Sequence, residues 1–572
     1  MEKEIKKIYN SVISEDIRGL KLRRFINKKG IETPKKQNMV FLTIGNNHAR
    51  AYVIKGVGKN LRKAIQNAIE NYIKFKPKKF YPKQLKVDIL SEYEPLKSDG
   101  RDFDFNNHKI NYDIGIEGLA FGSNFHTVFL PSEMVSYQLV SEQKLQVQNS
   151  FKAIQRHLPS TFSDFTKPID YRLNTLAYKI RTESFYIDNE QKVYRLFRDH
   201  RIYPSLTKED LVSAIKLVKD NYFKNVVNKN GKFIYSYLPQ INKSEQRYNI
   251  LRHAGTIYSM LEVYEIMPDQ QLLKQAKRAI RFLLRSIKPF NINNTFMKVV
   301  VERDCMKVGG NALAIIALAK YTKITGDKQY ISIMRELAYW FRENQDEKGE
   351  FIIHKQKYST GKAYDFTSRF YPGEAILALV RLYQIDKDKV WLDIAENAAH
   401  FLINIRDGNE TVDTITPDHW LLYGLNELYR ERNNDMYLGH SILISEAIMK
   451  DQITKDNASR RELIGGYATR TGKDPSSTPV ACRSEGLTAA YQLMRYCGYD
   501  ELAERIKHSI HQGIKYQLQM QLRTESVLHY QNKKLLLGSI QRGLKEHDLR
   551  IDYTQHNISS FVNYYLILNS FK

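Results

Sequence analysis

Residues 550–557, RIDYTQHN, gather chemically active side chains immediately before an apolar, helix-like run. The segment carries Arg550, Asp552, Tyr553 and His556 within eight positions. A carboxyl, a phenol and an imidazole can exchange protons with a bound molecule, and a guanidinium can neutralise its negative charge. Capping the helix would need only one such side chain. The spacing therefore predicts a site for acid–base chemistry where this helix begins.

Five other segments repeat this arrangement of polar groups before an apolar helical run. Each sets charged or hydrogen-bonding residues near a glycine or another small residue, at 246–255, 301–310, 364–375, 413–420 and 477–486. We expect these side chains to bind a substrate by neutralising charge, forming hydrogen bonds or stacking on a ring. Together with Arg550, Tyr553 and His556, the candidate substrate-binding residues are Arg252, His253, Arg369, Tyr371, His419, Trp420 and Arg483.

The carboxylates in these segments suit the cleavage of a glycosidic bond. That reaction needs a carboxylic acid to protonate the leaving oxygen and a carboxylate that activates water or acts as the nucleophile. We expect Asp418 and Glu485 to form this pair, because they begin neighbouring predicted helices beside small apolar residues that would raise one pKa. Asp552 is the third candidate catalytic residue. Elimination or epimerisation next to a uronic carboxylate would instead use a histidine or tyrosine base with an arginine, which the same segments supply.

Structural roles compete with each of these assignments. Asp418 and Asp552 lie close to predicted helix starts and would also serve as N-caps. The histidines of these segments would fit a protein core, or a metal site. Zinc sites need converging ligands, whereas Cys305, Cys482 and Cys497 are widely separated and form no CxxC pair. We therefore predict neither a metal nor a cofactor.

The elements that must position these side chains form an internal repeat after about residue 203. Five helical hairpins begin at Gly255, Gly310, Gly373, His419 and Gly486. The first helix of each hairpin is apolar nearly all round, and the second is amphipathic. This alternation predicts an inner ring of buried helices inside an outer ring of half-exposed ones.

Two further helices complete the pattern. Residues 208–226 are of the outer type and residues 557–571 are of the inner type. If these two pack together, they form a sixth hairpin and close the ring. The sequence thus resembles the (α/α)6 toroids of six-hairpin glycosidases and epimerase-like proteins. In a closed ring all inner helices run in the same direction, so the six polar segments would converge at one mouth. An open helical solenoid is the alternative.

The first 200 residues have a mixed α and β pattern instead. Strand-like runs at 39–45 and 51–58 precede one amphipathic helix at 60–75. After it come a strand at 88–96, a glycine-containing hairpin at 114–122, a Leu-Pro segment at 128–134 and a closing strand at 175–188. The order resembles AMMECR1-like domains, although that family's Leu-Arg-Gly-Cys-Ile-Gly motif is absent, so no activity attached to the motif is expected here. We therefore predict a multidomain protein, with an α+β domain at residues 1–200 followed by an all-α (α/α)6 toroid of six helical hairpins at residues 201–572.

The composition describes a packed, basic protein. Of the 572 residues, 42% are hydrophobic, and 88 Lys and Arg against 63 Asp and Glu give a net charge of +25. Such a charge favours anionic partners, among them glycans and nucleic acids. No apolar run is long enough to span a bilayer, the N-terminal residues lack the apolar core of a signal peptide, and the cysteines are few. We therefore expect a cytoplasmic protein without a membrane span.

These patterns together favour a carbohydrate-active protein that acts on or binds an anionic or amino-sugar glycan, in the synthesis or processing of a polysaccharide. Glycoside hydrolysis is the preferred reaction, and lyase or epimerase chemistry stays open. A second interpretation is a non-catalytic scaffold of glycan assembly whose N-terminal domain docks protein partners. A third is a nucleic-acid-binding protein, although no DNA- or RNA-binding motif is recognised.

Overall fold

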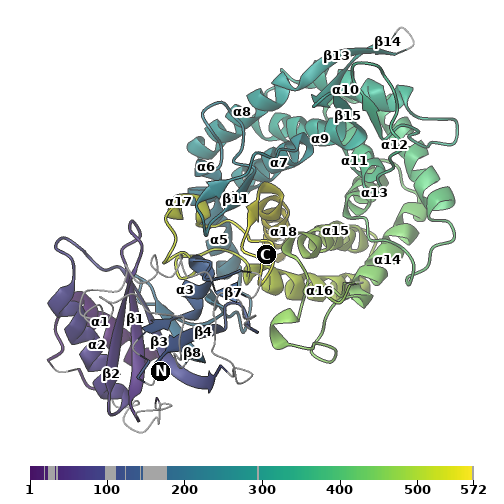
Figure 1. Ribbon diagram of the computed structural model, residues 1–572. Helices are drawn as coiled ribbons and strands as arrows, with labels where there is room; N and C mark the ends of the chain where they lie inside the picture. Colours follow the sequence, from purple (N-terminus) through teal and green to yellow (C-terminus); the bar gives the residue numbers. More distant parts are fainter. Residues whose placement is uncertain are drawn as a thin grey trace. The chain divides into compact units, whose positions relative to one another are not determined.

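The computed structural model describes residues 1–18, 20–22, 33, 36–96, 111–122, 124–125, 127–141, 144–145, 177–292, 295–469 and 471–569 (Figure 1). The chain divides into two compact units. Unit 1 comprises Met1–Pro204, Leu238–Lys243 and Leu522–Leu537, and unit 2 comprises Ser205–Tyr237, Ser244–Gln521 and Gly538–Lys572. An α+β unit and a helical toroid are thus both present, as the sequence predicted.

Six helices of unit 2 form a closed inner ring (Figure 1). Each contacts the next, and the last contacts the first, so the ring closes and an open solenoid is excluded. In order around the ring they are α7 (Ile250–Ile266), α9 (Val308–Thr325), α11 (Tyr371–Asp386), α13 (His419–Glu431), α15 (Ser477–Tyr496) and α18 (Ile551–Asn569).

Six outer helices cover this ring, one against each inner helix. Their outward faces are charged and their inward faces are apolar, which is why they stay half-exposed. They are α8 (Gln270–Arg285), α10 (Ile331–Glu343), α12 (Val390–Phe401), α14 (Asp435–Lys450), α16 (Asp500–Leu518) and α5 (Lys208–Leu217). Helix α5 packs on α18 and so forms the predicted sixth hairpin; it continues through a π-helical turn (Val218–Tyr222) into α6 (Phe223–Asn225).

The N-terminal ends of the inner helices lie together, as the predicted mouth requires. Residues from the first turns of adjacent helices contact each other around the ring, for example Arg252 of α7 with Asp552 of α18. Glycine allows the closest approach: a Cβ added at Gly373 of α11 would lie 2.6 Å from the backbone nitrogen of Leu421 in α13. A side chain at this position would therefore push two inner helices apart.

Three inner helices begin more than a full helical turn earlier than the sequence indicated. We expected them to start at Gly255, Gly486 and Asn557, whereas α7, α15 and α18 begin at Ile250, Ser477 and Ile551. The polar residues that we interpreted as entering loops therefore form the first turns of these helices. Because they face polar neighbours at the mouth, these turns lack the apolar pattern by which a buried helix is recognised.

Unit 2 also contains short β-strands between its helices. Strands β13 (Ile287–Ile292), β14 (Thr295–Glu302), β15 (Cys305–Lys307) and β16 (Lys355–Lys357) form one antiparallel sheet in this order. Strand β17 (Leu549–Arg550), which leads into α18, pairs with β11 (Ser236–Leu238). No helix in the described part of the chain is long and apolar enough to cross a membrane.

Unit 1 is built on an antiparallel sheet. Its main path runs β10-β9-β8-β3-β1-β2, and β4 pairs with both β8 and β5. The strands are β1 (Asn38–Gly45), β2 (Tyr52–Gly58), β3 (Gln84–Pro95), β4 (Glu117–Phe121), β5 (Thr127–Phe129), β8 (Ala177–Ile187), β9 (Val193–Phe197) and β10 (His200–Arg201). The predicted closing strand is β8; positions 175 and 176 lie outside the described residues.

Two helices cover one face of this sheet. Helices α1 (Glu2–Ser14) and α2 (Leu61–Phe75) bury Ile5, Ile8 and Ile65 against sheet residues such as Leu42. The other face carries a separate apolar cluster that includes Phe41, because strand side chains alternate between the two faces. The short helix α3 (Pro131–Ser136) follows β5. The resemblance to AMMECR1-like domains stays a prediction.

Residues 522–537 belong to unit 1 although they lie between toroid helices in the sequence, and they include α17 (Lys533–Leu536). The N–H of Ala51 donates to the carbonyl of Leu528. The side chain of Arg201 forms a two-point ion pair with Glu525 at 2.6 and 2.9 Å. The sequence analysis did not anticipate this return of the chain, which makes both units discontinuous.

Candidate functional site

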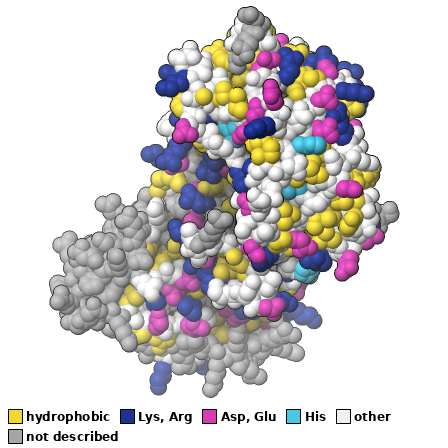
Figure 2. All heavy atoms as spheres, turned by 90° about the vertical axis from the view of Figure 1, so that its right-hand side faces the viewer, with side chains coloured by type: hydrophobic (Ala, Val, Ile, Leu, Met, Phe, Trp, Pro, Cys, Tyr) yellow, Lys and Arg dark blue, Asp and Glu magenta, His cyan; other side chains and the backbone are white. Residues whose placement is uncertain are grey.

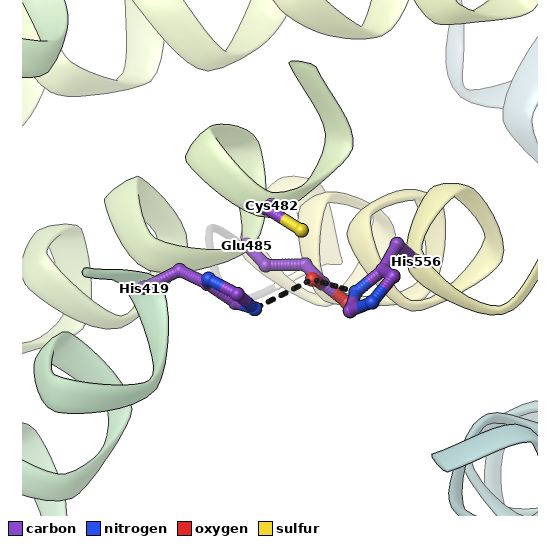
Figure 3. A group of neighbouring side chains, drawn as sticks. All are labelled: His419, Cys482, Glu485 and His556. Atoms are coloured by element: carbon purple, nitrogen blue, oxygen red, sulfur yellow. Dashed lines mark hydrogen bonds and ion pairs between the residues drawn. The ribbon is translucent and has the colours of Figure 1, made fainter. Parts of the chain in front are cut away.

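Four side chains at the mouth of the toroid converge on one point (Figure 3). His419 begins α13, Cys482 and Glu485 lie on one face of α15, and His556 lies in the second turn of α18. Nδ1 of His556 lies 2.9 Å from Oε2 of Glu485, and Nε2 of His419 lies 3.9 Å from the same oxygen. We call these four residues the mouth cluster.

Close helix packing brings the mouth cluster together. A Cβ added at Gly486 would lie 3.0 Å from Cα of His419, so α13 and α15 are nearly in backbone contact. The two imidazole rings of the cluster meet edge to face with centroids 5.5 Å apart. The indole of Trp420 packs against both of them and is itself only 5% exposed. Trp420 therefore holds the histidine rings in place, and it is not the open sugar platform that we expected.

The two histidines have opposite electrostatic environments. Burial lowers the pKa of His419 well below its usual range, and the positive charges of His556 and Arg483 add to this effect. Burial also opposes the charge on His556, but its interactions with Cys482 and Glu485 outweigh burial and raise its pKa well above the usual value. One ring of the pair is therefore cationic at neutral pH and the other is neutral.

The acidic members of the cluster are also shifted. Burial raises the pKa of Glu485 to about 7, against the opposing effect of His556. Burial likewise raises the pKa of the Cys482 thiol, again against His556. The hydrogen bond and ion pair with His556 thus favour the negatively charged form of Glu485.

The mouth cluster also has the composition of a metal site. His419, Cys482, Glu485 and His556 each offer one ligand atom, and these atoms all lie within 4.8 Å of one another. Thiolate, imidazole and carboxylate are the ligands that zinc takes in proteins. Our expectation of no metal was based on the spacing of the cysteines; the fold instead joins one cysteine to histidines and a glutamate from other helices.

Asp418, the predicted partner of Glu485, is the N-cap of α13. The N–H of Leu421 donates to its Oδ1 at 3.1 Å, and the residue has no exposed surface. Burial raises its pKa to about 6. Its Oδ2 and Oε2 of the nearby Glu374 are buried without a hydrogen-bond partner in the described part of the chain. Burial, and then the charge of Asp418, raise the pKa of Glu374 well above its usual value.

Asp552 lies in a cluster of arginines. Nε of Arg252 is 2.9 Å from its Oδ2, and Arg550 binds both carboxylate oxygens, at 2.5 and 2.8 Å. The guanidinium of Arg550 also lies over the ring of Tyr553, whose hydroxyl accepts a hydrogen bond from Arg542. These predicted site residues are thus brought together, but as a network in which the charges of Asp552 and its two arginines are already paired.

The remaining predicted residues lie apart from the mouth cluster. Arg369 donates to Asp407 at 2.8 Å, and Tyr371 packs its ring against His354. Both ring nitrogens of His253 are engaged, one with the hydroxyl of Tyr248 at 2.6 Å and the other with a backbone carbonyl at 2.9 Å. Burial lowers the pKa of His253 to about 3. It has the environment of a neutral core histidine.

Unlike Arg252, Arg369 and Arg550, Arg483 forms no ion pair with a carboxylate in the described part of the chain. Its Nε is buried and has no hydrogen-bond partner among the residues that the structure describes. Its guanidinium lies over the ring of Tyr467, 5.0 Å from the centroid, and its charge reaches His419. The guanidinium of Arg483 could therefore donate a hydrogen bond to an anion at the mouth.

Sequence reasoning missed an aromatic rim just before α11. Tyr364, Phe366 and Phe370 are 42%, 41% and 40% exposed. The ring of Phe370 lies 6.2 Å from that of His419. Three exposed aromatic rings within seven positions are an apolar surface of the kind that binds ligands. The signal was present in the sequence, but we considered only the polar members of this segment and Tyr371.

No family model matches the chain, and no curated protein matches it. It is similar in fold to the GH76A α-1,6-mannanase from Salegentibacter sp. HEL1_6, with 12% identity, 63% of this chain and 98% of that chain covered, and a TM-score of 0.43. It is also similar to cellobiose 2-epimerase from Bacillus thermoamylovorans B4167 (12%, 63% and 100%, TM-score 0.48) and to D-mannose isomerase (13%, 62% and 97%, TM-score 0.47). At these identities the comparisons concern the fold alone.

Proposed function

We propose that the protein is a carbohydrate-active enzyme that transfers a proton at a carbon of an anionic sugar, next to a carboxylate or carbonyl group. One observation carries the proposal: two histidines in different hydrogen-bonding states flank one carboxylate at the mouth. His556 is ion-paired with Glu485, whereas Nε2 of His419 has no hydrogen-bond partner in the described residues. A proton-transfer reaction needs such a pair of a charged donor and a free acceptor.

The two rings have distinct roles in this reaction. Nε2 of His419 takes the proton from the sugar carbon, and the electron pair left behind moves toward the adjacent carbonyl oxygen. His556 then returns a proton, either to the other face of the carbon, which is epimerisation, or to a leaving oxygen, which is elimination. Glu485 keeps His556 protonated and oriented, and Trp420 packs against both rings.

The groups around the pair indicate the kind of substrate. Arg483 has free donor capacity beside His419, which suits the carboxylate of a uronic acid and would stabilise the charge that develops during proton abstraction. The exposed ring of Phe370, next to His419, offers a stacking surface for a sugar face. Phe366 and Tyr364, in the same segment, are also exposed and would offer further stacking faces to an oligosaccharide or polysaccharide.

Glycoside hydrolysis by Asp418 and Glu485 has less support. Asp418 has no exposed surface on any atom and its carboxyl group caps α13, whereas the residue His419 keeps 8% of its surface exposed. Asp552 is neutralised by two arginines. Glu485 is the one predicted catalytic carboxylate that contacts both histidines.

The decisive experiment is incubation of chelator-treated protein with uronic-acid and amino-sugar oligosaccharides in deuterated water. Proton transfer at carbon incorporates deuterium into the sugar, which mass spectrometry and NMR detect; an unsaturated product identifies elimination, and new reducing ends identify hydrolysis. We expect deuterium incorporation that His419→Gln and Glu485→Gln each reduce by about 100-fold or more. The control is His508→Gln, which changes an exposed histidine of the outer helix α16 and should leave the rate unchanged.

The same experiment separates the alternative functions. Glycan binding without exchange, elimination or cleavage would contradict catalysis and favour a scaffold. Release of reducing ends without deuterium at carbon would restore the hydrolase. On the face shown in Figure 2, Lys and Arg side chains are interspersed with Asp and Glu. This face therefore does not support nucleic-acid binding. Affinity for oligonucleotides that falls steeply as the salt concentration rises would be the evidence in favour of that function.

A further inference from the structure

We infer that His419, Cys482, Glu485 and His556 form a binding site for a zinc ion. The inference goes beyond the proposed reaction, because it concerns which ion this cluster takes up and holds whether or not a sugar binds. It starts from the observation that the four ligand atoms lie within 4.8 Å of one another (Figure 3).

The distances suit a tetrahedral ion. With bonds of about 2.0 to 2.3 Å, zinc holds its four ligand atoms about 3.5 Å apart. Glu485 already lies 2.9 Å from the ring of His556 and 3.9 Å from that of His419. The four ligand atoms therefore need shifts on the order of 1 Å to surround one ion.

One ligand atom is already directed at the centre without a partner. Nε2 of His419 is buried and makes no hydrogen bond among the described residues, and the residue as a whole is 8% exposed. A buried imidazole nitrogen without a partner is costly, and coordination would satisfy it. The indole of Trp420 packs against this ring, with the two centroids 4.9 Å apart.

The charges of the four ligands favour a divalent ion. A thiolate and a carboxylate together carry two negative charges, and the two imidazoles bind as neutral ligands, so a divalent ion gives an uncharged complex. Neutrality matters at a buried site, where an unbalanced charge is expensive. Sulfur and imidazole favour zinc, whereas magnesium and calcium prefer sites made only of oxygen. Formation of the complex releases the thiol proton and the proton held between His556 and Glu485.

Zinc and the proposed reaction exclude each other. The lone pair that His419 would use as a base is the one that zinc occupies, and Glu485 cannot orient a protonated His556 when both are ligands. Four protein ligands also leave no open coordination position. Zinc at this site would therefore inhibit the enzyme, and a chelator would activate it.

Cobalt titration of chelator-treated full-length protein tests the site without any sugar. We expect one Co²⁺ per chain in tetrahedral coordination, with a thiolate-to-cobalt charge-transfer band that Zn²⁺ abolishes and Mg²⁺ does not. Cys482→Ser should remove the band, and His419→Gln should weaken binding by about tenfold or more. The matched control is Cys497→Ser, which changes a cysteine outside the cluster and should leave the titration unchanged. Absence of the band in the parent protein, or its persistence in Cys482→Ser, would overturn the site.

A second measurement needs no variant, in case Cys482→Ser fails to fold. Zn²⁺ should protect Cys482 from alkylation, while Cys305 and Cys497 react as before, which peptide mass spectrometry measures on the natural chain. Equal labelling of Cys482 with and without Zn²⁺ would contradict the inference. Because neither readout involves turnover, zinc binding can succeed when the proposed reaction fails, and the reverse.

Discussion

At the scale of single residues, burial and partners decide what each histidine of the toroid does. His419 and His556 lie side by side at the mouth, yet of the two only His556 has a carboxylate within hydrogen-bond distance among the residues that the structure describes. His253, on the neighbouring helix α7, satisfies both ring nitrogens inside the protein. Three histidines that look equivalent in the sequence thus become a cation, a free neutral ring and a packing residue.

The His253 environment predicts how stability depends on pH. Its pKa is lowered from 6.5 to about 3 in the folded protein, so between these values the unfolded chain binds a proton that the folded chain does not. Its stabilising contribution is complete above the unfolded pKa and is lost as pH falls, by about 1.4 kcal/mol per pH unit. Urea unfolding of the parent and of His253→Gln at several values between about pH 6 and pH 4 should show a shallower pH dependence in the variant. Equal slopes in the two proteins would contradict the prediction.

The candidate residues could be predicted individually, but their partners could not. Glu485 and His556 are 71 positions apart, and nothing local to either indicates the other. Asp418 and Asp552 are as polar as Glu485 in the sequence, and only the fold shows that one is a helix cap and the other an arginine partner. Cys482 was discounted as a ligand because we considered cysteine spacing alone.

At the scale of elements, the inner ring depends on helices that approach more closely than ordinary side chains allow. The repeat was predictable because apolar first helices and amphipathic second helices alternate along the sequence. The starts of α7, α15 and α18 were not, because residues facing a polar mouth resemble a loop. The order of the hairpins and the closure of the ring could be predicted from the sequence. The contacts between the first turns of the inner helices could not, and are seen only in the structure.

Gly373 provides a direct test of this packing. We expect Gly373→Ala to lower the free energy of unfolding by about 1 to 3 kcal/mol, since its Cβ would lie 2.6 Å from the backbone of α13. Gly439→Ala is the matched control. That glycine also lies within a helix, α14, but a Cβ there meets nothing within 4 Å, so alanine should stabilise the protein by up to about 1 kcal/mol. Both values come from urea unfolding; similar stabilities for the two variants would contradict the close-packing account.

At the scale of the whole molecule, the two units are separate compact bodies made from interleaved stretches of sequence. Unit 1 takes residues 522–537 from a position between toroid helices α16 and α18. Composition and repeats mark the boundary near residue 200, but they do not indicate this exchange, because the segment is short and has no periodic pattern.

The exchange predicts that residues 1–204 are not stable alone. The fragment lacks Glu525, the partner of the nearly buried Arg201, and His529, whose ring contacts Ser132 and Tyr137. An arginine buried without its carboxylate costs about 3 to 5 kcal/mol. We expect thermal unfolding by circular dichroism to show no cooperative transition for the fragment. Fusion of residues 522–537 through a flexible linker should restore one, and the same fusion carrying Glu525→Ala should restore less. A cooperative transition of equal midpoint in the bare fragment would refute the prediction.

The return of residues 522–537 also sets the order in which the protein matures on the ribosome. Unit 1 is synthesised first, yet one of its pieces follows more than 300 residues of the toroid. The nascent α+β unit therefore lacks the carbonyl of Leu528, to which the N–H of Ala51 donates in the folded protein, until late in synthesis. Domains usually fold in the order of their synthesis. Here the first unit to be synthesised can be completed only after five of the six inner helices have been translated.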